Sequence, residues 1–308
     1  MAKEPIKHHY IPQFIQRSFA DDNGKVCFFD NKKKESRLIT TCEIFMQRNL
    51  YRDEKLFPCD PVKIEKDLSK FENEASQVLR RFRNGNEIII SNYENEMLQI
   101  FFFIMSFRSP STYRSVSKSI SVNAKTKLSM NQNEDIREDL WKRNLGYLVN
   151  CRTINEILEH PHIDKEFKIF ARRDTFSFFG KYFSVAECPP TQSFVLGDTY
   201  PVTVSGSIQN NGYGLHMYDI FPITPNRVIL FSSNGATGTP PEVLSFRPAV
   251  IHPPKTNETD NCITIRVKKL FPEECDRLNQ LIIKESVTGY IQSSSHNFPL
   301  TVEKSHRP

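Results

Sequence analysis

The segment from residues 93 to 108 is apolar on almost every side, and this constrains the fold more than any other feature. It contains the run F-F-F-I-M at residues 101–105, followed by Phe107. A helix that is apolar all round has to be covered by the rest of the chain. We therefore expect a central helix over residues 93–108. The run is far too short to span a bilayer, so we expect no membrane protein.

The first half of the chain repeats apolar residues at helical spacing. A long helix is predicted to begin at Asp60-Pro61, because proline suits the first helical turn, and to end near Asn84-Gly85. Residues 25–30 and 37–41 alternate like the two strands of a small hairpin. Further helices are expected over residues 12–19, 111–127, 134–150 and 153–160.

The second half changes to the alternation of strands. Strands are predicted over residues 167–172, 175–179, 193–196, 202–205, 219–222, 227–232 and 263–267, with a helix over residues 272–285. Helices followed by strands indicate an α+β fold. We predict a single domain over residues 1–308 with two lobes. The lobe over about residues 1–160 is mainly helical with one hairpin, and the lobe over about residues 166–290 holds a mixed or antiparallel sheet and a closing C-terminal helix.

Charge and cysteine content limit the class of protein. Lys+Arg minus Asp+Glu is 41 − 36 = +5, a mild excess that permits nucleic-acid binding without requiring it. The 7 cysteines are odd in number, and no two stand as C-x-x-C. A disulfide framework or a structural zinc site is therefore not expected. We expect the protein to reside in a reducing cytoplasm. The first residues lack the apolar segment of a signal peptide.

The common catalytic signatures are missing from the sequence. It has no phosphate-binding G-x-x-x-x-G-K-[ST], no G-x-G-x-x-G after a strand, no H-E-x-x-H and no G-x-S-x-G. Nucleotide-fuelled enzymes, dinucleotide-binding enzymes and serine hydrolases of these types lose support. What remains is a set of polar residues in four separate segments.

The first of these segments is H-H-Y-I-P-Q-F-I-Q-R-S-F at residues 8–19. It is predicted to be a turn that runs into a helix, because Pro12 suits a first helical turn. Apolar residues of this helix would face inward, whereas Gln13 and Arg17 lie on other faces. A histidine here would transfer protons or hold a metal ion, or it would only order the start of the helix. Both alternatives stay open for His8 and His9.

Each of the other three segments also has a functional and a structural interpretation. Glu72 and Glu74 point apart on a helix, so only one of them can face a given partner. Arg108, at the end of the apolar helix, either caps that helix or reaches a carboxylate or phosphate. Asp198, in the segment G-D-T-Y-P, either faces a site at a sheet edge or makes a local turn.

The opening segment resembles a bacterial family of unknown function, numbered 4238, whose members begin with His-Tyr-Val/Ile-Pro-x-Phe. The resemblance continues at residues 71–72, at residues 107–110 with Arg114 after them, and at residues 197–201, where this chain has one extra residue before the proline. It aligns the family's His-Tyr pair with His9-Tyr10, which ranks His9 above His8. The resemblance implies no activity.

Two hypotheses follow. The first is a phosphodiesterase, most simply a nuclease that cleaves RNA or DNA in bacterial defence or as a toxin. Its catalytic residues would be His9, Glu72, Arg108 and Asp198, and the two carboxylates with His9 would hold Mg²⁺ or Mn²⁺ if a metal is used. Further roles are phosphate binding by Arg17 and Arg114 and support of the site by His8 and Gln13.

The second hypothesis is a non-enzymatic sensor or protein-interaction module. In that case, the same histidine, glutamate, arginine and aspartate form a buried network that fixes the junction of the two lobes. The two hypotheses differ in what they require of the structure. The enzyme needs these residues to line one open cleft, whereas the structural network needs them to be sealed and paired with one another.

Overall fold

A computed structural model describes residues 6–109, 113, 134–163, 168, 181–207, 214–233, 255–257 and 262–293. Three predicted elements lie outside the described residues: the helix over residues 111–127 and the strands over residues 167–172 and 175–179. Of the residues in these elements, only Tyr113 and Lys168 are described. Arg114 also lies outside the described residues. In the described ranges, no helix is long and apolar enough to cross a membrane.

The apolar segment forms the central helix α3 (Asn92–Phe107), as predicted. The Ser91 hydroxyl accepts the backbone N–H of Glu94, whose carboxylate accepts the N–H of Ser91 in return. This capping box fixes where the helix begins. Every residue from Met97 to Met105 is buried, because the rest of the chain surrounds the helix.

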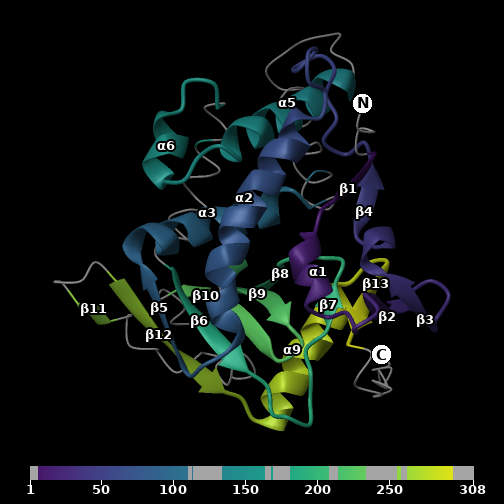
Figure 1. The fold of residues 1–308 in the computed structure, drawn as a ribbon, viewed down its shortest axis with the longest axis vertical. Helices are drawn as coiled ribbons and strands as arrows, with labels where there is room; N and C mark the ends of the chain where they lie inside the picture. The colour runs from purple at the N-terminus through teal and green to yellow at the C-terminus, as the bar shows by residue number, and fades with distance from the viewer. Residues whose placement is uncertain are drawn as a thin grey trace.

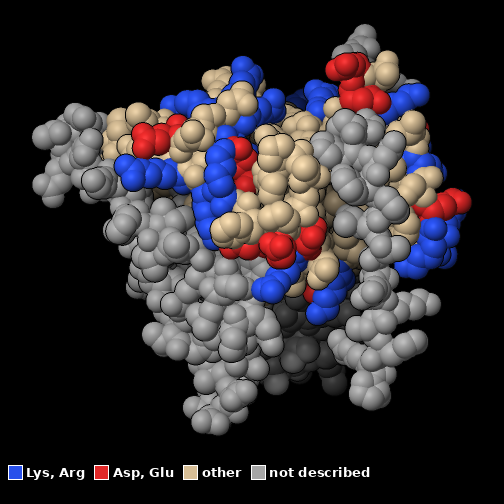
Figure 2. Space-filling model, turned by 90° about the horizontal axis from the view of Figure 1, so that it is seen from below, with Lys and Arg blue, Asp and Glu red and all other residues tan. Residues whose placement is uncertain are grey.

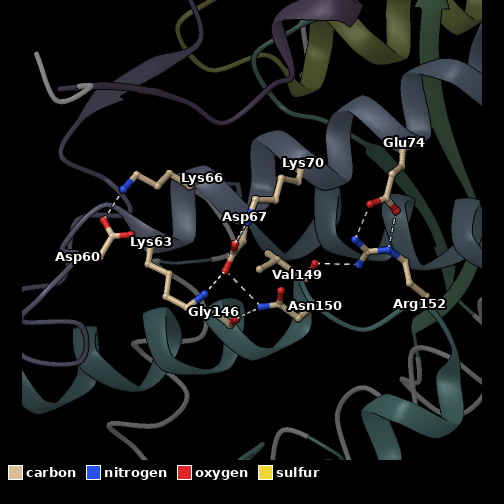
Figure 3. Close-up of polar contacts among 10 residues, drawn as sticks. All are labelled: Asp60, Lys63, Lys66, Asp67, Lys70, Glu74, Gly146, Val149, Asn150 and Arg152. Carbon is tan, nitrogen blue, oxygen red and sulfur yellow. Dashed lines mark hydrogen bonds and ion pairs between the residues drawn. The ribbon is translucent and has the colours of Figure 1, made fainter. Parts of the chain in front are cut away.

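The other large helices of the first half pack beside α3. Helix α2 (Lys63–Leu79) continues as the short 3₁₀ helix η2 (Arg80–Arg83). Helices α5 (Glu134–Leu148) and α6 (Ile154–Glu159) lie at the top of Figure 1, away from the large sheet. A polar seam joins α2 to the end of α5 (Figure 3), in which Asp67 accepts hydrogen bonds from Lys63, Lys70 and Asn150.

The large sheet has seven strands among the described residues. Its order is β11 (Lys255–Asn257), β12 (Cys262–Lys269), β6 (Lys181–Glu187), β10 (Arg227–Ser233), β9 (Gly214–Thr224) and β8 (Val202–Ser207), with β5 (Glu87–Ser91) also paired to β12. Strands β12 and β6 run parallel and the other pairs are antiparallel, so the sheet is mixed. Strand β5 was not predicted, and it ties the first half of the chain to this sheet.

The predicted hairpin is confirmed and lies in a smaller sheet. In this sheet the strands lie in the order β3 (Glu35–Thr40), β2 (Lys25–Asp30), β13 (Gly289–Gln292) and β7 (Leu196–Gly197). The hairpin therefore pairs with the far end of the described chain (Figure 1). Helix α9 (Pro272–Glu285) is where the sequence predicts a C-terminal helix, and the short strand β13, which was not predicted, follows it.

The opening segment differs from its prediction in its first residues. Residues 7–9 form strand β1 (Lys7–His9), antiparallel to β4 (Met46–Arg48), with the 3₁₀ helix η1 (Thr41–Glu43) just before β4. Helix α1 (Gln13–Arg17) comes next and packs as expected. The Phe14 ring lies 6.1 Å from that of Phe101 in α3, and the Ser18 hydroxyl donates to the carbonyl of Ile223 in β9 at 2.6 Å. The helix thus lies between the central helix and the large sheet.

Candidate functional site

Arg108, directly after α3, is the centre of the buried polar network. Its side chain is only 1% exposed. The guanidinium donates to the carboxylate of Glu72 in α2 and to the backbone carbonyl of His9 in β1. Its Cζ also lies 5.6 Å from the centroid of the Tyr51 ring, as in a cation–π contact. Burial acts to lower the pKa of Arg108, but Tyr51 and Glu72 raise it above its ordinary value, so the guanidinium stays charged.

Glu65 is a second carboxylate near this guanidinium, one that the sequence did not single out. Burial raises the pKa of Glu65 to about 7, with Arg108 opposing the rise and Glu72 adding to it. Its Oε2 atom is buried and has no hydrogen-bond partner among the described residues. Glu65 therefore titrates near neutral pH. Glu72 is the carboxylate that accepts the hydrogen bond of the arginine.

The two histidines face opposite ways because successive residues of a strand alternate. His8 is fully buried, and its Nδ1 accepts the backbone N–H of Tyr51 at 2.8 Å. Its ring stacks on that of Tyr51, with the centroids 5.5 Å apart. Of the two, His8 is therefore the one built into the core.

His9 is half-buried and lies next to α1. The amide nitrogen of Gln13 is 3.3 Å from the ring nitrogens of His9, and Gln13 accepts a hydrogen bond from Arg17 in turn. Burial, followed by the charge of Arg108, lowers the pKa of His9 to about 4. The imidazole is therefore neutral at physiological pH.

The remaining predicted residues lie apart from Arg108. Both carboxylate oxygens of Asp198 accept backbone N–H groups, those of Val287 and Thr288, each at 2.7 Å, and the Thr288 hydroxyl donates to it as well. Asp198 thus holds the loop between α9 and β13. Glu74 points away from Glu72, as expected for neighbours two positions apart, and pairs with Arg152 (Figure 3).

The structure therefore brings His9, Glu72 and Arg108 together. It places Asp198 elsewhere, directly after β7 and against the loop between α9 and β13. Within the described ranges, no three His, Cys, Asp or Glu side chains are grouped so that they could hold a metal ion. The predicted metal set of Glu72, Asp198 and His9 accordingly does not meet at one point.

A hollow of about 460 Å³ lies next to this network. It opens between β4, the loop that follows β4, and the part of α5 that carries Trp141 and Lys142. Trp141 forms part of its wall and stacks on Tyr51 at 6.0 Å, which connects the hollow to the buried arginine. The lining residues are Gln47, Arg48, Asn49, Leu50, Arg52, Asp53, Glu54, Lys55, Tyr113, Trp141 and Lys142.

Asp53 is the buried acid of this hollow, with 5% exposure. Its Oδ1 accepts the backbone N–H groups of Lys55 and Leu56 at 3.0 and 2.9 Å. Its Oδ2 is buried without a hydrogen-bond partner among the described residues. Lys142, also buried, donates to the carbonyl of Arg52 at 2.9 Å and so fixes the loop against α5. In the sequence, only the dense charges of R-D-E-K at residues 52–55 hinted at this loop.

These features define an α+β protein in which a buried arginine, directly after α3, binds the opening motif and α2. A polar hollow lies next to this arginine network. A family model described as "Protein of unknown function (DUF4238)" matches residues 7–297, so the chain belongs to the DUF4238 family. The match includes the opening motif, Glu72, Arg108 and Asp198. No curated protein and no solved structure matches the chain significantly.

Proposed function

We propose that the protein is a non-enzymatic sensor that takes a small anionic ligand into the hollow beside Trp141. One observation carries the proposal: the candidate catalytic arginine is sealed and paired, while the hollow next to it has an excess of basic residues. The histidine, glutamate and arginine of the family motif then hold the wall of this binding site in place.

The state of Arg108 supports the structural part of the proposal. A residue that neutralises a phosphate must reach the substrate. Arg108 is 1% exposed and gives its two terminal nitrogens to Glu72 and to the His9 carbonyl. These two hydrogen bonds tie the side chain to two other elements, while its Nε is buried without a hydrogen-bond partner among the described residues. Arg108 therefore serves to join α2, α3 and β1.

The lining of the hollow supports the binding part. Four basic residues stand against two acidic ones, Asp53 and Glu54. Its volume of about 460 Å³ falls in the range of small-molecule sites. The partly buried ring of Tyr113 supplies apolar surface beside these charges, and it packs on the buried ring of Trp141 with the centroids 5.0 Å apart. An anion that also carries an apolar ring fits this combination.

The experiment is a calorimetric titration with inorganic pyrophosphate, which tests the anion site without assuming the rest of the ligand. Arg48→Glu reverses one charge on the exposed rim and should weaken binding by about tenfold or more. Arg83→Glu, an exposed change outside the hollow, is the matched control and should leave the affinity unchanged. No binding by the wild type, or equal losses in the two variants, would reject the anion site.

We keep a nuclease acting on RNA or DNA as the second proposal. Support comes from His9, which is neutral at physiological pH and half-buried beside Gln13 and Arg17, so its ring nitrogens suit proton transfer or a metal ion. The surface gives less support. Figure 2 shows one face on which acidic and basic side chains of the described residues lie next to one another, without a broad basic area.

The nuclease proposal is tested with mixed RNA and DNA, with and without Mg²⁺ or Mn²⁺. It expects cleavage that His9→Ala abolishes in a folded protein. It also expects that Arg17→Ala and Arg114→Ala each lower the slope of log K against log salt by roughly one unit. Absence of cleavage under every metal condition leaves the sensor as the better account.

A further inference from the structure

We infer that the Tyr51 hydroxyl, the Glu65 carboxyl group and the Nε–H of Arg108 together bind one internal water molecule. This site lies inside the junction that joins β1, α2 and the end of α3, and it does not depend on any ligand of the hollow. Three observations carry the inference. The three polar atoms are buried without a partner, their side chains are neighbours, and their donors and acceptors complement those of water.

The buried atoms are the first observation. Tyr51 Oη, Glu65 Oε2 and Arg108 Nε have no hydrogen-bond partner among the described residues. Tyr51 is fully buried and the side chain of Arg108 is only 1% exposed, so bulk water does not reach these two groups. A buried polar atom without a partner is unfavourable, and in folded proteins such atoms are nearly always paired with protein or with ordered water.

The three side chains come from different segments and meet at the guanidinium of Arg108. Tyr51 follows β4, Glu65 lies in the first turn of α2, and Arg108 follows α3. The Cζ atom of Arg108 lies 5.6 Å from the centroid of the Tyr51 ring. Burial raises the pKa of both Tyr51 and Glu65, and the charge of Arg108 opposes each rise, so both groups lie near the guanidinium. Glu65 also raises the pKa of Tyr51, which places the carboxyl group and the hydroxyl near each other.

Direct bonds within the network do not satisfy these atoms. The terminal nitrogens of Arg108 donate to the Glu72 carboxylate and to the His9 carbonyl, whereas its Nε–H has no acceptor among the described residues. Glu65 and Tyr51 are neighbours of the guanidinium, but Oε2 and Oη are not bonded to it. Polar groups that are close without touching are commonly bridged by water.

The chemistry of the three groups favours water over other small ligands. A water molecule can accept from the Nε–H of Arg108, donate to Oε2 of Glu65, and either donate to or accept from the Tyr51 hydroxyl. Internal waters typically make about three such hydrogen bonds. The charge of Arg108 disfavours a cation at this point, and the carboxylate of Glu72 disfavours an anion. The burial of Tyr51 and Arg108 excludes a larger organic molecule.

The first test is a crystal structure of the wild-type protein at a resolution that shows ordered water. It should show one water peak within about 2.7–3.2 Å of Tyr51 Oη, Glu65 Oε2 and Arg108 Nε. If these atoms instead bond to one another or to other protein groups, with no water between them, the inference is overturned.

The second test counts long-lived internal waters in solution by relaxation dispersion of the water oxygen. Glu65→Met puts an apolar group of similar length at the site and should remove about one such water per molecule. Glu65→Gln keeps an acceptor oxygen and should keep the water. Glu54→Met is the matched control, because the side chain of Glu54 is 70% exposed, and it should change nothing. Circular dichroism establishes that the variants are folded. An unchanged count in folded Glu65→Met, or an equal loss in Glu54→Met, contradicts the site, and the wild-type crystal structure decides if Glu65→Met does not fold.

Discussion

The guanidinium of Arg108 donates to the carboxylate of Glu72, although 36 positions separate the two residues. The same guanidinium donates to the backbone carbonyl of His9, 99 positions away. Three segments that are scattered in the sequence therefore meet at one side chain, which joins β1, α2 and the end of α3.

Arg108→Met should lower the free energy of unfolding by about 3–5 kcal/mol, because it leaves the carboxylate of Glu72 without its buried partner. The double variant Arg108→Met with Glu72→Met should be more stable than the single one, since it removes the stranded charge as well. Urea unfolding measures both. Arg266→Met breaks an exposed pair with Glu87 and should cost less than about 1 kcal/mol. A loss below that control value for Arg108→Met would contradict the structural role.

Glu65 should make the stability depend on pH. Its pKa is raised from 4.5 to about 7, so the folded state favours the protonated form. The stability that protonated Glu65 contributes is present at low pH and is lost as the pH rises from 4.5 through 7. His9, with its pKa lowered to about 4, acts oppositely, because its contribution is lost as the pH falls from 6.5 through 4.

The measurement for Glu65 is therefore the difference in the free energy of unfolding between Glu65→Gln and the wild type. The contribution of His9 is the same in both proteins and cancels in this difference. This variant mimics the protonated acid. Its stability advantage should grow between pH 5 and pH 8, to at most about 3 kcal/mol. Chemical unfolding at several pH values provides the curve. A difference that does not change with pH would show that Glu65 is not buried as described.

His8→Ala should destabilise the protein more than His9→Ala. His8 is fully buried, accepts the N–H of Tyr51 and stacks on its ring, so its removal leaves a cavity and an unpaired N–H. We expect a loss of about 2–5 kcal/mol for His8→Ala. His9 is only half-buried, and its carbonyl bond to Arg108 survives the substitution. Thermal melting compares the two variants, and equal losses would reject this ranking.

The sequence also predicts that His9 matters more than His8 for activity. This prediction is tested by comparing the activities of His8→Ala and His9→Ala under conditions in which both variants are equally folded.

Gly289→Ala should disrupt the smaller sheet. A Cβ atom at this position would lie 2.1 Å from the carbonyl oxygen of Phe29, a backbone atom that cannot turn away. We expect a loss of about 2 kcal/mol or more, as in overpacked sites. Gly146→Ala is a control, because its Cβ would meet only side-chain atoms, at 3.4 Å. Similar melting temperatures for the two variants would contradict the pairing of β13 with β2.

The sequence predicted the elements whose pattern repeats over many residues. Helices α2, α3 and α9 and the hairpin are where periodicity placed them, because burial of one face or of all faces leaves a local signal. Strand partners could not be predicted in this way. The pairing of β5 with β12 and of β13 with β2 depends on contacts between distant segments. Strand β1 is too short for any period to show. The division into two lobes stays a prediction.

The candidate site was predicted only where the family motif marks it. Glu72, Arg108 and His9 do meet, but Asp198 holds a loop instead, since a carboxylate after a glycine serves a turn as well as a site. Glu65 and Asp53 were missed because what distinguishes each of them is one buried carboxylate oxygen without a donor among the described residues, which only the fold creates. The metal, the nucleic acid and the cytoplasmic location stay predictions.

The role of the buried network is tested by the affinity of the Arg108→Met/Glu72→Met double variant for pyrophosphate, determined by calorimetry below the melting temperature of the variant. If the network only supports the wall of the hollow, the folded double variant should bind pyrophosphate within about twofold of the wild type, while Arg48→Glu loses about tenfold. A folded double variant that has lost binding, with Arg48→Glu unaffected, would place Arg108 in the binding site and contradict the account.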